Sequence, residues 1–377
     1  MSRSATRSAP APTPLERLAP NGPDAMGREI AAGPAGVEAA LGAVRESPAV
    51  GLLADAARVI LVGTGASLAV AEVAAPLAGE RWSAREASAV ALGDLDGRRA
   101  APGDVAVVVS MSGRSPESRA AARRLAQSGC PIVALTADER SPLAAAADVV
   151  VATPIGEETG AATKSALSAL SALLALAGEL ETDAESAARL RDRLRATVAD
   201  VSAVAPGGAL VAKGAEVWAV GFGPALGLAR ATSLLLHEKA RRPTVFCSPS
   251  EFRHGPIEAA TRSDALILLD PGQIGGEVDG SLVAYLDRLA AEAAELGVGL
   301  IRIGPRSTPP IAVDGSLPLA VHVPIDESAP RAERVLHALV RAQQLARATA
   351  HARGTYADEF VVLRRIVRAA DDLVPPT

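Results

Sequence analysis

The sequence predicts an α/β protein in which two doubly wound, mostly parallel sheets flanked by helices follow one another along the chain. Two observations support this prediction. Short apolar runs alternate with helical segments from Val59 to Ala152, and the same alternation restarts at Val217. Each half also opens with a strand that ends in a glycine turn, Gly63-Thr64-Gly65 in the first and Gly221-Phe222-Gly223 in the second. Alternating strands and helices are typical of a parallel sheet that helices cover.

The individual elements can be placed in chain order. Residues 1–25 are rich in Pro, Ala, Ser and Arg without apolar periodicity, and we expect them to be disordered. Val37, Leu41 and Val44 have helical spacing, which predicts a first helix that begins near Met26. We expect strands at 59–62, 104–109, 131–135 and 148–152, then at 217–220, 265–269, 299–303 and 319–323, with a helix over 225–236.

These elements divide the chain into two domains. We expect the first domain, with its N-terminal helix, at 26–200 and the second at 215–345. The segment between them, 201–214, is rich in Val, Ala, Pro and Gly and is expected to be a linker. Residues 346–377 would form a C-terminal tail that closes the active site.

Composition excludes several classes of partner. The 377 residues carry a net charge of −5 with only 2% aromatic residues, so neither a basic patch nor stacking rings are available for nucleic acid. The longest apolar stretches, such as 166–177, are shorter than a bilayer crossing, and no membrane association is expected. The two cysteines, Cys130 and Cys247, lack metal-ligand spacing, which favours a reduced, cytoplasmic setting and no metal site.

The segment from Val107 to Ser118 has the layout of a phosphate-binding turn. A buried strand runs into a turn rich in Ser and Gly just where a helix begins. Unpaired backbone N–H groups, hydroxyl donors and the positive end of a helix dipole meet at such a point. Ser110, Ser112 and Ser115 are the candidate donors. The alternative is an ordinary strand-to-helix loop, which uses the same residue types.

Five motifs in succession resemble one family. They are G-T-G-A-S (63–67), S-M-S-G-R-S-P-E-S (110–118), E-E-T-G-A-A-T-K-S (157–165), H-E-K (237–239) and S-E-F-R-H-G-P (250–256). This succession resembles the double sugar-isomerase (SIS) domain proteins, especially the isomerase half of glucosamine-6-phosphate synthase and stand-alone amino-sugar-phosphate isomerases and deaminases. The resemblance covers nearly the whole chain from Met26 onward. Because no amidotransferase domain precedes the motifs, we do not expect a complete synthase.

The resemblance implies two tandem SIS domains that have different roles. The first domain would anchor the phosphate and the second would supply a catalytic glutamate and histidine. Glu238 matches the family's base, which moves a proton between C1 and C2 of the open-chain sugar. His254 matches the histidine that opens the ring, and it comes from the neighbouring protomer in relatives, so a homodimer is implied. No cofactor is expected.

The resemblance also assigns the groups that hold the substrate, a phosphorylated amino sugar. The hydroxyl groups and the backbone around the phosphate belong to Ser67, Ser110, Met111, Ser112 and Ser115. Further substrate contacts are expected from Gly65, Ala161, Ala162, Glu251 and Arg365.

Both catalytic assignments are chemically reasonable from the residues alone. A carboxylate that removes a proton from carbon needs its basicity raised by partial burial, and Glu238 follows the apolar run Leu234-Leu235-Leu236. Histidine gives and takes protons near neutrality, with a pKa of about 6.5. The alternatives are a solvated helix-end carboxylate paired with Lys239 or Arg241, and a loop histidine that caps backbone groups.

Departures from the family pattern narrow the chemistry. Leu235 stands where the synthases carry a lysine, and no lysine follows Lys239. Arg365, the counterpart of their terminal lysine, stays protonated and cannot form a Schiff base.

Three functions remain open. The first is isomerisation or deamination of an amino-sugar 6-phosphate. The second is elimination of the C3 substituent after the same C2 deprotonation, as in a lyase or dehydratase. The third is a sugar-phosphate sensor without catalysis.

Overall fold

The first lobe is built around a five-stranded parallel sheet. The computed structural model describes residues 18, 24–79, 87–90, 100–272, 281–305, 320–355 and 358, and for 87–90 only the backbone. The strand order is β2-β1-β3-β4-β5, and every pairing is parallel. The strands are β1 (Arg58–Val62), β2 (Ala87–Val90), β3 (Asp104–Val109), β4 (Ile132–Thr136) and β5 (Val149–Ala152).

Helices cover both faces of this sheet. Alternate residues of β1 face opposite ways: Val59 and Leu61 pack into the core beneath α2, α4 and α6, whereas Ile60 and Val62 pack against α5. The helices are α2 (Ala25–Arg45), α3 (Ala49–Ala54), α4 (Ala66–Ala78), α5 (Pro116–Gln127), the 3₁₀ turn η2 (Ala144–Ala146), α6 (Lys164–Leu176) and α7 (Ala184–Ala199).

The second lobe repeats this arrangement. Its sheet order, read from the edge strand β7, is β7-β6-β8-β9-β10, which is the order of the first sheet, and all its pairings are parallel. The strands are β6 (Val217–Gly221), β7 (Val245–Cys247), β8 (Ala265–Leu269), β9 (Gly299–Pro305) and β10 (Ala320–Ile325). Its helices are α8 (Val204–Lys213), α9 (Pro224–Ala240), α10 (Pro249–Arg253), the 3₁₀ turn η3 (Pro256–Ala259), α11 (Ser281–Glu295) and α12 (Arg331–Arg353). The predicted fold class is confirmed.

The expected bounds of the linker and of the C-terminal tail differ from those of the observed helices. Helix α8 fills most of the segment 201–214 and packs on α12, so this stretch is a structural part of the second lobe. Helix α12 continues through position 345 to Arg353, so the first residues of the expected tail are helical. Most of residues 1–25 and nearly all of the tail beyond 355 lie outside the described residues. Strands β2 and β7 were not predicted.

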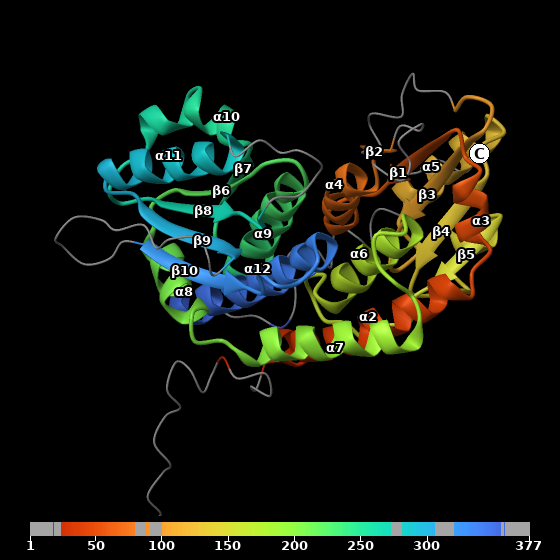
Figure 1. Cartoon of the computed structure of the whole chain (residues 1–377), viewed down its shortest axis with the longest axis horizontal. Coiled ribbons are helices and arrows are strands. Elements are labelled where there is room, and N and C mark those ends of the chain that lie inside the picture. The colour runs from red at the N-terminus through yellow and green to blue at the C-terminus, as the bar shows by residue number, and fades with distance from the viewer. Residues whose placement is uncertain are drawn as a thin grey trace, which may run out of the picture.

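The two lobes are joined by helices that cross between them. In Figure 1, α4 and α9 face each other at the centre, α12 extends from the second lobe toward the first, and α7 runs beneath both. The crossing of α4 and α9 is close at Gly227, where a Cβ atom would lie 2.6 Å from the backbone nitrogen of Val73. Beside it, Nε of Arg230 lies 2.6 Å from Oε2 of Glu72. The lobes therefore share one core rather than sitting on a flexible hinge.

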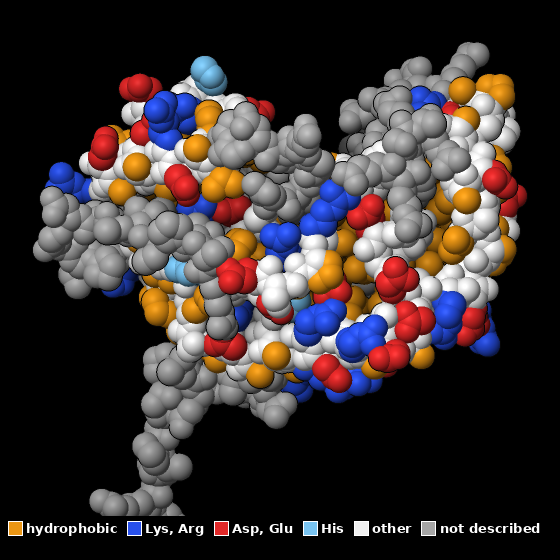
Figure 2. All heavy atoms as spheres, in the orientation of Figure 1, with side chains coloured by type: hydrophobic (Ala, Val, Ile, Leu, Met, Phe, Trp, Pro, Cys, Tyr) orange, Lys and Arg blue, Asp and Glu red, His pale blue; other side chains and the backbone are white. Residues whose placement is uncertain are grey.

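The face of the molecule that Figure 2 shows carries interspersed acidic and basic side chains. Along α7 these charges form neighbouring pairs, such as Arg189 with Glu185 and Arg191 with Glu38. None of the described helices is long and apolar enough to cross a membrane.

Candidate functional site

The serine-rich turn after β3 is held open by its neighbours. The N–H of Gly113 donates to the carbonyl oxygen of Ser110 at 2.9 Å, and the hydroxyl of Thr136 and the N–H of Ala137 both donate to the carbonyl oxygen of Met111. Among the described residues, nothing accepts a hydrogen bond from the N–H groups of Met111 and Ser112. Two free backbone donors in one turn beside a helix start are what an anion requires.

The serines of this turn differ in their surroundings. Ser110 is buried, and its hydroxyl has no partner within the described part of the chain, whereas Ser112 is exposed and accepts a hydrogen bond from the N–H of Arg114. Ser115 is the N-cap of α5: its hydroxyl accepts from the N–H of Ser118 and donates to Oε2 of Glu117 at 2.7 Å. In this structure Ser115 therefore stabilises the helix start.

The glycine turn of β1 lies next to the serine turn and also reaches the second lobe. Strands β1 and β3 are neighbours in the sheet, so the turns that follow them share one edge. Ser67 is half-buried, in the first turn of α4. Gly65 has φ +59°, and a Cβ atom on it would lie 4.0 Å from Cδ2 of Leu234, on helix α9. The first-lobe turn thus contacts α9 one helical turn before Glu238.

Glu238 is the half-buried carboxyl group near the end of α9. Its carboxyl group makes no hydrogen bond within the described residues. Burial raises its pKa to about 7, and the positive charge of Lys239 opposes this only in part. Lys239 is itself buried and turns away, because its Nζ donates to the carbonyl oxygen of Thr159 at 3.1 Å. The alternative interpretation, a solvated carboxylate paired with Lys239, is therefore not what the structure shows, and Glu238 is left as a carboxyl group poised to exchange protons near neutrality.

The segment 157–163 joins the two lobes at this point. Ala161 is fully buried and Ala162 half-buried. A Cβ atom on Gly160 would lie 2.7 Å from Nζ of Lys239, so the absence of a side chain there makes room for the lysine. On the other side, the side chain of Gln343, on α12, donates to the carbonyl oxygen of Thr163 at 2.9 Å.

Three groups that hold this segment were missed by the sequence analysis. They are Glu29 on α2, Lys239 on α9 and Gln343 on α12. For Glu29 a signal was present. It lies between Met26 and Ile30 on the helix face that the apolar periodicity assigns to the core, and a carboxyl group in that stripe needs a partner. For Lys239 and Gln343, nothing in the local sequence indicates the contact.

His254 and Glu238 do not meet within one chain. Alternate residues of β6 divide the second lobe: Val217 and Ala219 pack toward the core that contains α9 and α12, whereas Trp218 and Val220 pack toward Phe252 of α10 and Leu289 of α11. Glu238 is on α9, and His254 ends α10 on the opposite face, as Figure 1 shows for the two helices. The imidazole of His254 is exposed and makes no hydrogen bond within the described residues.

Two residues that were expected to contact the substrate remain, Glu251 and Arg365. Glu251 forms a capping box at the start of α10, in which its Oε2 accepts the N–H of Ser248 at 2.8 Å. These hydrogen bonds lower the pKa of Glu251. Arg365 lies outside the described residues. In the described residues, no group of three or more His, Cys, Asp or Glu side chains could hold a metal ion.

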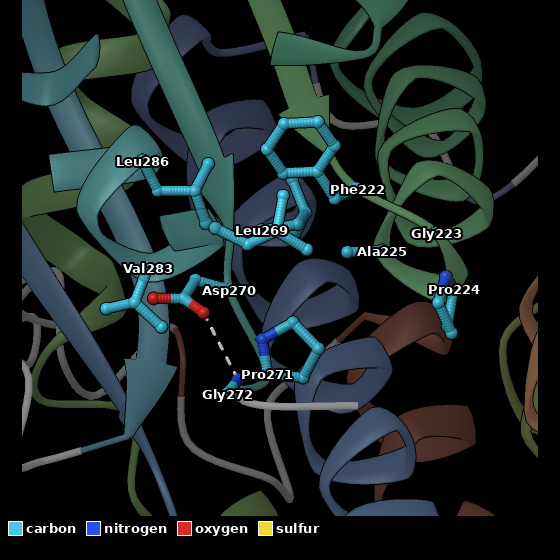
Figure 3. Close-up of a pocket in the computed structure, with 11 residues that line it drawn as sticks. Phe222, Gly223, Pro224, Ala225, Leu269, Asp270, Pro271, Gly272, Val283 and Leu286 are labelled. Atoms are coloured by element: carbon cyan, nitrogen blue, oxygen red, sulfur yellow. Dashed lines mark hydrogen bonds between the residues drawn. The ribbon is translucent and has the colours of Figure 1, made fainter. Parts of the chain in front are cut away.

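The second sheet has its own cavity at the corresponding position. It measures about 90 Å³, lies where the turns after β6 and β8 meet, and is lined by Phe222, Pro224, Leu269, Asp270, Val283 and Leu286 among others (Figure 3). Asp270 is engaged: its Oδ1 accepts from the N–H of Gly272, and its Oδ2 lies 2.5 Å from Nη2 of Arg302. The lining of this cavity is mostly apolar and its carboxylate is already paired with Arg302, and among the described residues that line it there are no serine hydroxyl groups like those of the turn after β3.

Comparisons with known proteins agree with this geometry. Residues 52–178, which make up most of the first lobe, match the model of the SIS domain family. Over 60 residues the chain is 47% identical to an N-acetylmuramic acid 6-phosphate etherase of Symbiobacterium thermophilum, covering 16% of this chain and 20% of that protein. Over 179 residues it is 26% identical to a glutamine–fructose-6-phosphate aminotransferase (isomerizing) of Sulfurisphaera tokodaii, covering 47% of this chain and 30% of that protein. The matches thus span less than a third of these curated relatives.

A solved structure extends the likeness in fold to both lobes. The tagatose-6-phosphate ketose/aldose isomerase of Escherichia coli superposes with a TM-score of 0.74 at 22% identity, covering 89% of this chain and 95% of that one. The likeness to this isomerase is therefore one of fold over nearly the whole chain, whereas the likeness in sequence is to the etherase and the aminotransferase over shorter segments.

Proposed function

We propose that this protein, a phosphosugar-processing member of the SIS group, is an isomerase or deaminase of an amino-sugar 6-phosphate. The observation that supports it best is Glu238, a half-buried carboxyl group that lacks a hydrogen-bond partner among the described residues and has a pKa raised to about 7. Such a group is a suitable base for a carbon acid at neutral pH. The glycine turn at 63–65 contacts Leu234, one helical turn before Glu238, and the neighbouring serine turn carries two backbone donors without a partner among the described residues.

In this proposal the chain's residues act in a fixed order. The turns at 63–67 and 110–115 bind the phosphate. His254 of a second chain opens the sugar ring, since within one chain it lies on the far face of the second sheet from Glu238. Glu238 removes the C2 proton, and the electron pair of the C2–H bond moves toward the C1 carbonyl to give an enediol or enolamine. Return of the proton at C1 gives a ketose, or an imine that water hydrolyses with release of ammonia.

A second candidate shares the first step. The stretch that is 47% identical to an etherase acting on N-acetylmuramic acid 6-phosphate favours elimination. After loss of the C2 proton, the same electron pair would form a C2–C3 double bond as the C3 substituent leaves. An acetamide at C2 favours this outcome, because an amide nitrogen does not readily become the imine that deamination requires.

One experiment separates these candidates. Proton NMR of the protein in D2O is followed with glucosamine 6-phosphate, its N-acetyl form and glucose 6-phosphate. Loss of the C2 proton signal supports a Glu238-type base, new ketose signals support the isomerase, and a new vinylic proton supports elimination. Glu238→Gln should abolish each change, while the exposed Glu181→Gln serves as the matched control. Unchanged spectra with binding retained would overturn catalysis and favour the sensor.

A further inference from the structure

The hydroxyl group of Thr163 lies between two carboxyl groups. Its Oγ1 is 3.0 Å from Oε2 of Glu29 and 3.0 Å from Oε1 of Glu158. A hydroxyl group carries one hydrogen and can donate it to only one of them. If both carboxyls were ionised, the second contact would bring two oxygen atoms together with no hydrogen between them. Both contacts are favourable only when one carboxyl carries a proton.

The surroundings decide which carboxyl carries it. Glu158 is well supplied with donors: its oxygens accept from the N–H groups of Thr163 and Ser165, both at 3.0 Å, and from the hydroxyl of Ser165. These donors form the N-terminus of α6, whose dipole favours an anion. Glu29 is only 6% exposed, and besides Thr163 it accepts, among the described residues, only the N–H of Thr159. Ionisation therefore costs least at Glu158 and most at Glu29.

The nearby charges agree with this assignment. Burial raises the pKa of Glu29, the negative charge of Glu158 raises it further, and the hydrogen bonds from Thr159 and Thr163 and the charge of Lys239 oppose the rise without cancelling it. Asp24, which directly precedes α2, is paired with Arg347 and His351 of α12. The charge of Arg347 is therefore directed at Asp24.

We propose that Glu29 is a positioning residue that works as a neutral acid. Its Oε2–H donates to Oγ1 of Thr163, the hydroxyl of Thr163 donates to Glu158, and Oε1 of Glu29 accepts the N–H of Thr159. Glu29 thereby clamps both ends of the stretch 159–163, which carries Ala161 and Ala162. The role in substrate binding rests on the proposed function, in which this stretch lines the sugar; the protonation state does not.

A pair of substitutions tests the clamp. Glutamine has the shape and the hydrogen bonds of a protonated glutamic acid, with one donor for Thr163 and one acceptor for Thr159. Glu29→Gln should leave the Kd for glucosamine 6-phosphate within about twofold of wild type, whereas Glu29→Ala should raise it roughly tenfold by releasing the stretch. Glu38→Gln, which lies on the same helix and faces Arg191, is the control and should match wild type.

Two further measurements read the protonation state directly. Infrared difference spectra should show a protonated carboxyl C=O band near neutral pH that disappears in Glu29→Gln. A carboxyl with a raised pKa stabilises the fold fully below its unfolded pKa and less as the pH rises through the folded pKa. Wild-type stability should therefore fall over that range relative to Glu29→Gln.

The outcomes can be distinguished from those for the proposed function. A protonated-carboxyl band that is the same in wild type and Glu29→Gln, or a Glu29→Gln variant as destabilised at high pH as Glu29→Ala, would overturn the neutral acid. If wild type binds no sugar phosphate at all, the proposed function fails while infrared and unfolding data still decide the state of Glu29.

Discussion

At the scale of single residues, the protein contains two carboxyl groups whose burial changes their chemistry in different ways. Glu29 is buried and contacts only the N–H of Thr159 and the hydroxyl of Thr163 among the described residues, so in our proposal its proton is part of the structure. Glu238 is half-buried without a partner in the described residues, so its proton is free to exchange. A carboxyl held by its neighbours can position a segment, and one without partners can act on a substrate.

The raised pKa of Glu238 predicts the pH dependence of turnover. A base must be ionised to accept a proton, so kcat/KM should rise about tenfold per pH unit on the acid side and level off above the pKa of about 7. A profile that is already flat from pH 5 upward would contradict Glu238 as the base. The control is a solvent viscosity series, which shows whether chemistry or product release limits the rate at each pH.

At the scale of elements, the shape of the serine turn at 110–115 depends on one glycine. Gly113 has φ +59°, and a Cβ atom on it would lie 2.0 Å from Oγ and 2.3 Å from Cβ of Ser141. Gly113→Ala should therefore push the turn away from β4 and weaken sugar-phosphate binding at least tenfold, as isothermal titration would measure. Gly129→Ala is the matched control, because φ there is +78° and nothing lies within 4 Å. It should cost about 1 kcal/mol of stability and leave affinity unchanged. Equal affinities for both variants would remove the turn from the binding site.

The same scale shows what the sequence could reveal and what it could not. Continuous apolar runs, such as those in Asp104–Val109 and Ala265–Leu269, are buried strands and were predicted at those bounds. The edge strand β7 has only three residues, and its first, Val245, is 52% exposed. An apolar run this short does not predict a strand. Helix α8 was hidden in a stretch rich in Gly and Pro, where tertiary packing on α12 overrides a low helix propensity.

The site was predictable only where its residues are close in sequence. The serine turn follows from a local pattern, whereas Glu238 was singled out by the resemblance of the H-E-K motif to the SIS family. That Glu29 binds Thr159 and Thr163, more than a hundred positions later, follows from the packing of α2 on α6, which no local pattern encodes. Likewise, the separation of Glu238 and His254 appears only once the sheet assigns α9 and α10 to opposite faces.

At the scale of the whole molecule, a buried ion pair connects the start of α2 to α12. Nη2 of Arg347 lies 2.6 Å from Oδ2 of Asp24, with side chains 3% and 1% exposed. Hydrogen bonds from His351 and Arg347 outweigh burial and lower the pKa of Asp24, so its stabilisation is present above the unfolded pKa and is lost as the pH falls through the folded value. Asp24→Asn keeps the N-cap of α2 but breaks the ion pair.

We expect that substitution to cost about 3 kcal/mol or more in chemical denaturation, because it leaves a buried guanidinium without its counter-charge. Asp183→Asn is the control, since Asp183 caps α7 at an exposed position and asparagine caps equally well. A loss within about 0.5 kcal/mol for both variants would mean that the pair contributes little, as exposed ion pairs do.

The largest-scale prediction concerns two chains acting together. His254 and Glu238 lie on opposite faces of the second lobe, so the function that we propose for them requires His254 from a symmetric partner. Each single variant, Glu238→Gln and His254→Ala, should then be inactive alone. When the two are co-expressed, the His254→Ala chain keeps Glu238 and receives His254 from its partner, which restores one of the two sites in each heterodimer. Random pairing makes half of the dimers mixed, so about a quarter of wild-type turnover should return. Sedimentation must show the dimer in the same preparation. Turnover that stays at the level of the separate variants, or an active monomer, would place both groups in one chain and contradict the shared site.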